Sequence, residues 1–329
     1  MQPVPSRVVE SYRIRYQLGS LLGKRERVVA EAIDLHCHAQ LGTEDPLDIA
    51  QAATRAHMGS VVFKGLAGEH PAEHVRQVQE ETLRWAETEG LEPIQCLAGV
   101  QTDKGYGGLD FDHVRDQVDK GVRVIWFPVI GSAHSLHRVG APARLLPPGT
   151  TEEPVSPPLP WEAARRAGQY LLDDEDRNLK PVAREILRLA ADRGVAVSFA
   201  HSSKPEMEAL AEECVRIGYH QAFIDHPYGP QIGLEFEDLA PFADAGITFN
   251  FTYDEISPLL GVDPQVMMNT IKAIGPAHFT LSSDGGNPLL PGAVSALSTL
   301  VQYARAYGID ESAIHQMTVE NPKRVLGIA

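Results

Sequence analysis

The segment AIDLHCH, residues 32–38, joins a short apolar run to two histidines, His36 and His38, that are separated by one residue. In a β-strand, residues i and i+2 face the same side, so both imidazoles would point one way and Cys37 the other. One metal ion could therefore bind both histidines at the end of this strand. Since the chain holds 13 histidines, the triplet alone is also compatible with two unrelated side chains.

Seven further segments share this character. Each is short, apolar and rich in β-branched residues, and each leads through a polar or glycine-containing stretch into helix-like sequence. The eight segments are AIDLHCH (32–38), SVVFKG (60–65), IQCLAGV (94–100), VRVIWFPV (122–129), VAVSFAHS (195–202), AFIDHPY (222–228), ITFNFTY (247–253) and HFTLSSDGG (278–286). Successive segments begin 25 to 34 residues apart, except that the fifth begins 73 residues after the fourth. This repetition indicates consecutive β-α units.

The alternation predicts an α/β fold, a (β/α)8 TIM barrel distorted by a long insertion after the fourth strand. Strands that are apolar throughout are typical of parallel sheets covered by helices. An open doubly wound sheet would need a glycine-rich phosphate-binding turn after its first strand, and HAQLGTEDP (38–46) does not supply one. Helices are expected at 71–90, 181–194 and 204–218, because these amphipathic segments end in glycine and two of them begin at proline.

The barrel is expected to occupy residues 32–329 as one domain, since single barrels of about 250 residues or more are common. Residues 1–31 precede the first strand and form an N-terminal extension. The long step between the fourth and fifth strands contains a proline-rich segment, 137–169, which predicts an inserted loop of extended character. We expect the whole insertion, 130–180, to lie near the active-site mouth.

The chain of 329 residues has a formal net charge of −15, from 29 Lys plus Arg against 44 Asp plus Glu. This acidic balance argues against a nucleic acid or an anionic membrane as partner and favours a small-molecule substrate. The three cysteines are odd in number and form no CxxC pair, which points to a reducing compartment, the cytoplasm. The sequence contains no run of about 18 apolar residues, so no membrane span is expected. The extension and the insertion supply surface for a homo-oligomer.

Three later strands end in potential metal ligands: His201 ends the fifth, His226 the sixth and Asp284 the eighth. The C-terminal ends of barrel strands meet at one rim, where barrel enzymes keep their chemistry, so these residues should converge with His36 and His38. Taken singly, the later histidines could be hydrogen-bonded rim residues, and Asp284 could cap a turn before its two glycines. Their convergence favours a metal site.

Lys64 closes the second strand, in an apolar context where a cation is costly unless it is paired or modified. Three interpretations stay open. Lys64 could contact the substrate electrostatically, it could be carbamylated and bridge two metal ions, or it could snorkel at the edge of the barrel.

This combination of HxH on strand one, histidines on strands five and six and an aspartate on strand eight resembles the amidohydrolase superfamily of metal-dependent barrels, over about residues 32–327. The motifs that further carry the resemblance are His226-Pro227, SSDGGNP (282–288) and VENPKRVLG (319–327). The nearest resemblance is to a subfamily known mainly as a domain of unknown function. That subfamily has a lysine on strand two and Trp-x-Pro on strand four, which are here Lys64 and Trp126-Phe127-Pro128.

The resemblance implies that His36, His38 and Asp284 hold the more buried metal ion. It also implies that His201 is a further ligand and that His226 is either a ligand of a second ion or an acid/base. Well-known members with two ions bridge them through a carboxylated lysine from strand four, whereas VIWFPVIGS (124–132) contains no lysine. Either Lys64 replaces that lysine from strand two, or the site holds one ion.

The donor set suits Zn2+, and Mn2+ could use the same ligands. The implied protein is a metal-dependent hydrolase in which a metal-activated water attacks a small-molecule amide, cyclic amide or imide, or a related ester or lactone. Its catalytic residues would be Asp284 and His226. Two alternatives stay open, a metal-dependent decarboxylase or lyase on the same fold and a non-catalytic metal-binding barrel. Candidate substrate-binding residues near the strand ends are His134, His137, Tyr228, Asn250, Tyr253 and Asp254.

Overall fold

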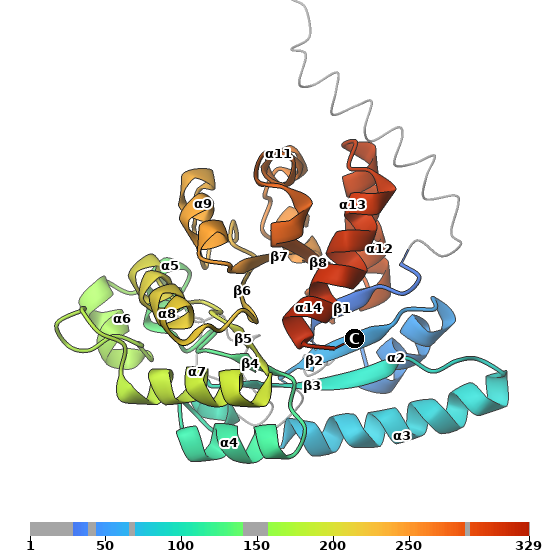
Figure 1. Ribbon diagram of the computed structural model, residues 1–329, viewed down its shortest axis with the longest axis horizontal. Helices are drawn as coiled ribbons and strands as arrows, with labels where there is room; N and C mark the ends of the chain where they lie inside the picture. Colours follow the sequence, from blue (N-terminus) through green and yellow to red (C-terminus); the bar gives the residue numbers. More distant parts are fainter. Residues whose placement is uncertain (1–28, 39–43, 66–69, 141–156, 287–289, 329) are drawn as a thin grey trace, which may run out of the picture.

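A computed structural model describes residues 29–38, 44–65, 70–140, 157–286 and 290–328 of the chain. Within them, eight parallel strands pair in the order of the sequence and helices lie outside them (Figure 1). The strands are β1 (Ile33–His38), β2 (Ser60–Lys64), β3 (Gln95–Gln101), β4 (Val124–Trp126), β5 (Ala196–Ser198), β6 (Ala222–Asp225), β7 (Thr248–Thr252) and β8 (Phe279–Ser282). The predicted (β/α)8 barrel is confirmed.

Strand β1 closes the barrel against the end of β8. Cys37 forms a parallel bridge with Gly285, the His38 N–H donates to the Gly285 carbonyl at 2.8 Å, and the Asp284 N–H donates to the His36 carbonyl at 2.9 Å. A Cβ on Gly286 would lie 1.4 Å from the His38 carbonyl oxygen, so this close approach requires glycine. The first and last strands of the sequence therefore meet at the rim that carries the histidines.

The strands occur where the sequence predicts them, although several end earlier. The fourth was expected over 122–129, whereas β4 spans Val124–Trp126. Phe127 still donates its N–H to the Ser198 carbonyl at 3.1 Å, but Pro128 has no N–H with which to continue the ladder. The sixth and eighth segments likewise leave their strands before His226 and Asp284, which places both side chains in the turns at the rim.

Helices cover the outside of the barrel, with α3, α4 and α7 on one side and α9, α11 and α12 on the other in Figure 1. The three expected helices correspond to α3, α7 and α8, and Gly90, Gly194 and Gly218 follow them in the left-handed conformation. The longer helices are α2 (Pro46–Arg55), α3 (Pro71–Glu89), α4 (Phe111–Asp119), α7 (Pro181–Arg193), α8 (Lys204–Ile217), α9 (Phe236–Asp244), α11 (Pro264–Ile274) and α12 (Ala293–Ala306). Short helical segments are η1 (Lys104–Tyr106), α5 (Ala133–Arg138), α6 (Trp161–Ala167), α10 (Tyr253–Ile256), η3 (Pro276–His278), α13 (Glu311–His315), η4 (Gln316–Glu320) and α14 (Asn321–Leu326).

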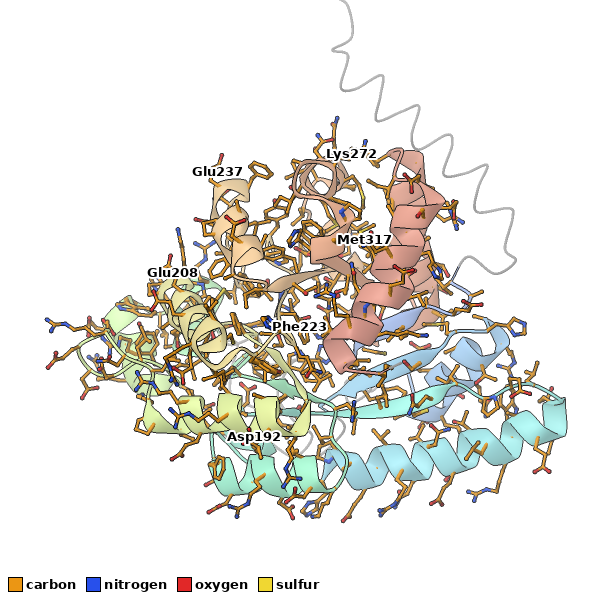
Figure 2. All side chains as sticks on the ribbon, in the orientation of Figure 1. Asp192, Glu208, Phe223, Glu237, Lys272 and Met317 are labelled. Atoms are coloured by element: carbon orange, nitrogen blue, oxygen red, sulfur yellow. The ribbon has the colours of Figure 1, made fainter. Side chains whose placement is uncertain are left out.

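The core lies between the strands and this helical layer. Phe223 of β6 and Met317 of the C-terminal helical segment are buried, whereas charged side chains such as Glu208 and Lys272 point outward from the helices (Figure 2). Cys37 is fully buried, as expected of a residue facing the helices. None of the described helices is long and apolar enough to cross a membrane.

The insertion after β4 is partly helical, so the expectation of a loop over 137–169 is wrong for its described ends. Helix α5 begins where the Ser132 hydroxyl accepts the Ser135 N–H, and α6 begins directly after Pro160. The two ends of this segment lie side by side, because the Gln169 N–H donates to the Gly131 carbonyl at 2.7 Å. Residues 141–156 and most of the extension 1–31 lie outside the described residues.

Candidate metal centre

Three side chains from the two ends of the barrel sequence place their ligand atoms together at the C-terminal rim. His36 Nε2 lies 3.2 Å from His38 Nε2 and 3.2 Å from Asp284 Oδ1. His38 Nε2 lies 3.1 Å from the same oxygen. The three residues form a group that could hold one metal ion, as predicted for His36, His38 and Asp284.

The spacing of these atoms fits a shared divalent ion. Two ligands of a tetrahedral zinc ion, each about 2.0–2.1 Å from the metal, lie about 3.3 Å apart. The three separations of 3.1 to 3.2 Å are close to that value. Two imidazole nitrogens and a carboxylate oxygen are a donor set used by zinc and by manganese. The residues present therefore fit the ion that the sequence predicts.

Burial and neighbouring charges give these ligands the protonation states that metal binding requires. Burial lowers the pKa of His38 to about 4, so its imidazole is neutral at pH 7. Burial alone would raise the pKa of Asp284, but the imidazoles of His36 and His38 hold it well below its usual range. A neutral imidazole and an ionised carboxylate are the protonation states that bind metals.

Lys64 points into the same cluster. Its Nζ lies 2.9 Å from His36 Nε2 and 5.6 Å from the centre of the Trp126 ring. Only 1% of Lys64 is exposed, which rules out the snorkelling side chain that the sequence left open. Burial lowers its pKa, while the nearby carboxylates of Asp284 and Asp225 act in the opposite direction.

His201 and His226 stand beside the three-ligand group. His226 Nε2 lies 3.8 Å from Asp284 Oδ2, the carboxylate oxygen that faces away from His38. The rings of His201 and His226 meet edge to face, with centroids 5.1 Å apart. Burial lowers the pKa of His226 to about 4 and that of His201 well below its usual value. A neutral His226 imidazole thus lies near the second oxygen of Asp284, with the neutral His201 ring packed against it. The predicted roles of both as ligands or acid/base stay predictions.

Hydrogen bonds from the loops hold these two histidines. The Ser132 hydroxyl donates to the His201 carbonyl at 2.8 Å, and the Ser135 hydroxyl lies 3.3 Å from His201 Nδ1. Gln231 Nε2 lies 3.2 Å from His226 Nδ1. The start of the insertion is therefore in direct contact with the site.

Three non-glycine residues at the rim adopt the left-handed backbone conformation. They are Ala200 (φ 49°), His226 (φ 33°) and Asp284 (φ 48°). Such conformations are costly for residues with a Cβ and persist where surrounding contacts hold them. Here the His226 N–H donates to the Asn250 carbonyl at 2.8 Å. Three of the six non-glycine residues with positive φ in the described part of the chain thus lie where the site residues leave their strands.

Asp225, which the sequence analysis did not single out, lies under the cluster and is fully buried. Its Oδ1 accepts from Asn250 Nδ2 at 2.7 Å and lies 3.0 Å from His36 Nδ1. Its Oδ2 accepts from Trp126 Nε1 at 2.7 Å and from Ser198 Oγ at 2.5 Å. Burial alone would raise the pKa of Asp225, but His36 and the other neighbours hold it below its usual range.

A signal for Asp225 exists in the sequence. It occupies the last position of an otherwise apolar strand, AFID, where an ionised carboxylate must find partners. Those partners come from strands far away in the sequence, so the signal indicates a buried polar contact without naming it.

The two candidate substrate-binding histidines of the insertion make contacts with backbone carbonyls. His134 Nε2 lies 2.9 Å from the Ile232 carbonyl, and His137 Nδ1 lies 2.9 Å from the Leu159 carbonyl. The His137 ring also packs edge-on against Trp161. These contacts join α5 to neighbouring loops, and a substrate role for either ring stays a prediction.

The remaining candidates lie after β6 and on β7. The Tyr228 hydroxyl is hydrogen-bonded to the Thr270 hydroxyl at 2.6 Å, and Asn250 is part of the layer beneath the metal cluster. Tyr253 is partly exposed at the start of α10. Burial, together with the charge of Asp284, raises the pKa of Asp254 to about 8. Substrate contacts by these residues also stay predictions.

Known proteins share this architecture. An amidohydrolase from Pseudomonas aeruginosa is similar with a TM-score of 0.59 and 13% identity, over 91% of this chain and 96% of that one. A weak promiscuous lactonase engineered for organophosphate hydrolysis has a TM-score of 0.52 and 17% identity, over 92% and 97%. The 5-methylcytosine deaminase from Klebsiella pneumoniae has a TM-score of 0.50 and 13% identity, over 91% and 75%.

At these identities the likeness is one of fold, the (β/α)8 barrel that the sequence predicts. No curated protein sequence matches the chain. Residues 31–250 match a family of unknown function, DUF6282. This match covers β1 to β6, the first part of β7 and five of the proposed metal-site residues, His36, His38, Lys64, His201 and His226. The chain belongs to this family of unknown function, DUF6282.

Proposed function

We propose that the protein is a metal-dependent hydrolase that cleaves the C–N bond of a small-molecule amide, cyclic amide or imide, or the C–O bond of a related ester or lactone. One observation carries the proposal, namely that the ligand atoms of His36, His38 and Asp284 meet at separations of 3.1 to 3.2 Å on the C-terminal rim. Barrel enzymes keep their chemistry at this rim. The fold relatives named as an amidohydrolase, a lactonase and a deaminase support the reaction class.

A divalent ion at this position would supply a Lewis acid that polarises a carbonyl and acidifies a water molecule. Asp284 offers its two oxygens to different neighbours, with Oδ1 toward His36 and His38 and Oδ2 toward His226. As a carboxylate it can take a proton from the attacking water and pass it to the leaving group. His226, 3.8 Å from Oδ2, is placed to assist that transfer.

The test is metal analysis and turnover of the purified protein with two variants. We expect bound zinc or manganese in the wild type and loss of the metal in His36→Ala. Asp284→Asn should lower hydrolysis of the active substrate by about 100- to 10,000-fold, because it removes the proton acceptor. His220→Ala is the matched control, since this exposed histidine precedes β6 at the opposite end of the barrel.

A panel of amides, imides and lactones in 18O-labelled water provides the turnover measurement. Incorporation of labelled oxygen into the product supports hydrolysis. Release of CO2 from an aromatic acid added to the panel, with no labelled oxygen in the remaining product, would instead identify a decarboxylase on the same fold. A wild-type protein that stays metal-free after loading with zinc or manganese would contradict the proposal.

A further inference from the structure

The groups around Asp225 make further hydrogen bonds, and these fix which of them donate to its carboxylate. The Ser198 hydroxyl oxygen accepts the Ala200 N–H at 3.0 Å, so its own proton points to Asp225 Oδ2, 2.5 Å away. The Trp126 indole nitrogen, 2.7 Å from the same oxygen, can only donate. Oδ2 of Asp225 is therefore an acceptor on both sides.

A second chain of hydrogen bonds orients Asn250. The Leu35 N–H donates to the Ser282 hydroxyl oxygen at 3.2 Å, so the Ser282 proton points to Asn250 Oδ1 at 2.7 Å. The Thr280 hydroxyl donates to the same amide oxygen at 2.8 Å. With its oxygen committed, Asn250 must turn its amino group to Asp225 Oδ1.

Three of the four groups around Asp225 are thus donors, and the fourth is His36 Nδ1 at 3.0 Å. We propose that Asp225 is a positioning residue that keeps the proton of His36 on Nδ1, so that the Nε2 lone pair faces His38 and Asp284. The inference rests on the proposed metal site and adds the group that sets the tautomer of its most buried ligand. Carboxylates that orient metal-binding histidines in this way raise metal affinity.

Asp225→Ala tests this role by removing the acceptor of the His36 Nδ1 proton. Asparagine is not a suitable replacement, because Trp126 Nε1 and Asn250 Nδ2 donate to opposite oxygens of Asp225, and one of them would face the new amino group in either orientation of the amide. Without the carboxylate, the proton of His36 can also reside on Nε2, which points into the metal cluster. We expect zinc affinity to fall by about 10- to 100-fold, the effect typical of removing such a partner.

The experiment follows the tautomer and the metal separately. Metal-free protein with 15N-labelled histidine is measured by NMR, which identifies the ring nitrogen that carries the proton. His36 is assigned from the signals lost in His36→Ala. Zinc affinity is measured by chelator competition. The matched control is Ser198→Ala, which removes one donor to the same carboxylate and leaves the acceptor of His36 in place.

The expected result is an Nδ1-protonated His36 in wild type and Ser198→Ala, an Nε2-protonated fraction of His36 in Asp225→Ala, and weaker zinc binding in Asp225→Ala alone. An Nε2-protonated His36 in the wild type would overturn the inference without any variant, even if Asp225→Ala failed to fold. An unchanged tautomer or unchanged zinc affinity in a folded Asp225→Ala would overturn it as well. A wild type that binds no zinc but carries the Nδ1 proton would refute the proposed function and leave the tautomer assignment standing.

Discussion

Lys64 lies where β2 meets the metal cluster, and strand four offers Trp126 at the rim in place of a lysine. The rings of His201 and His226 are in contact, and His226 lies beside Asp284 Oδ2. A second ion held by these histidines would need an anionic bridge to the first. At the scale of single residues, Lys64 is the side chain that decides between one ion and two.

If Lys64 is the bridge, it carries a carbamate in the loaded protein. Zinc-loaded protein prepared in 13C-labelled bicarbonate should then show a carbamate carbon signal by NMR and two zinc ions per chain. Lys64→Arg has the positive charge of the unmodified lysine but should form no carbamate, so both the signal and the second ion should be lost. One ion per chain and no carbamate signal in the wild type would assign Lys64 to substrate contact instead.

At the scale of elements, the packing of β3 against β4 explains how the barrel accommodates Trp126. A Cβ on Gly99 would lie 1.9 Å from Cζ3 of the Trp126 ring. We therefore expect Gly99→Ala to lower the free energy of unfolding by about 1–3 kcal/mol, as overpacking does in cores. Urea unfolding of the wild type and of Gly99→Ala measures this change in the free energy of unfolding.

The control for this prediction is the double-mutant cycle with Trp126→Phe, which removes the outer ring of the indole. Because the two sites are in contact, the double variant should be less destabilised than the sum of the single variants. Strictly additive losses would show that Gly99 is not required by Trp126.

Helix α8 begins at a second buried carboxylate. Glu206 accepts the N–H of Leu171 at 2.7 Å and the N–H of Ser203 at 2.7 Å. Burial raises its pKa to about 7, although these hydrogen bonds and the charge of Lys180 act to lower it. The proton is thus held more tightly in the folded state than in the unfolded chain, where an ordinary glutamate has a pKa near 4.5.

The sign of the resulting pH dependence follows from linkage. The stabilisation from this proton is complete below about pH 4.5 and is lost as the pH rises through about 7. Relative to Glu206→Gln, which cannot ionise, the wild type should lose stability on the order of 1–3 kcal/mol over this window. Urea unfolding at a series of pH values measures the difference between the two proteins. A difference that does not change with pH would show that Glu206 keeps an ordinary pKa.

At the scale of the whole molecule, the proposed metal would connect the first strand of the barrel to the last. His36 and His38 come from β1 and Asp284 follows β8, where the barrel closes. An ion bound to the folded protein and not to the unfolded chain stabilises it by about 4 kcal/mol at a thousandfold excess over its dissociation constant. Metal binding should therefore stabilise the whole barrel against unfolding.

Thermal unfolding with and without zinc tests this. The melting temperature should rise with zinc in the wild type and in His220→Ala, and should not rise in His36→Ala. A wild type that melts at the same temperature in zinc and in chelator would contradict metal binding at the closure of the barrel.

Much of this protein follows from its sequence alone. The eight strands, the helices α3, α7 and α8, and the cluster of His36, His38 and Asp284 were predicted correctly. Apolar periodicity reports burial of the local chain, and in a parallel barrel all strands end at one rim, so residues at strand ends converge whatever the details of packing.

Only the tertiary structure decided the rest. It placed the helices α5 and α6 in the expected loop, buried Lys64 beside His36 Nε2, and brought Asp225 under His36. The physical reason is that a buried polar atom takes its partners from whichever strands lie beside it or across the barrel. The donors around Asp225 come from β1, β4, β5 and β7, and their meeting depends on strand register and side-chain direction in three dimensions.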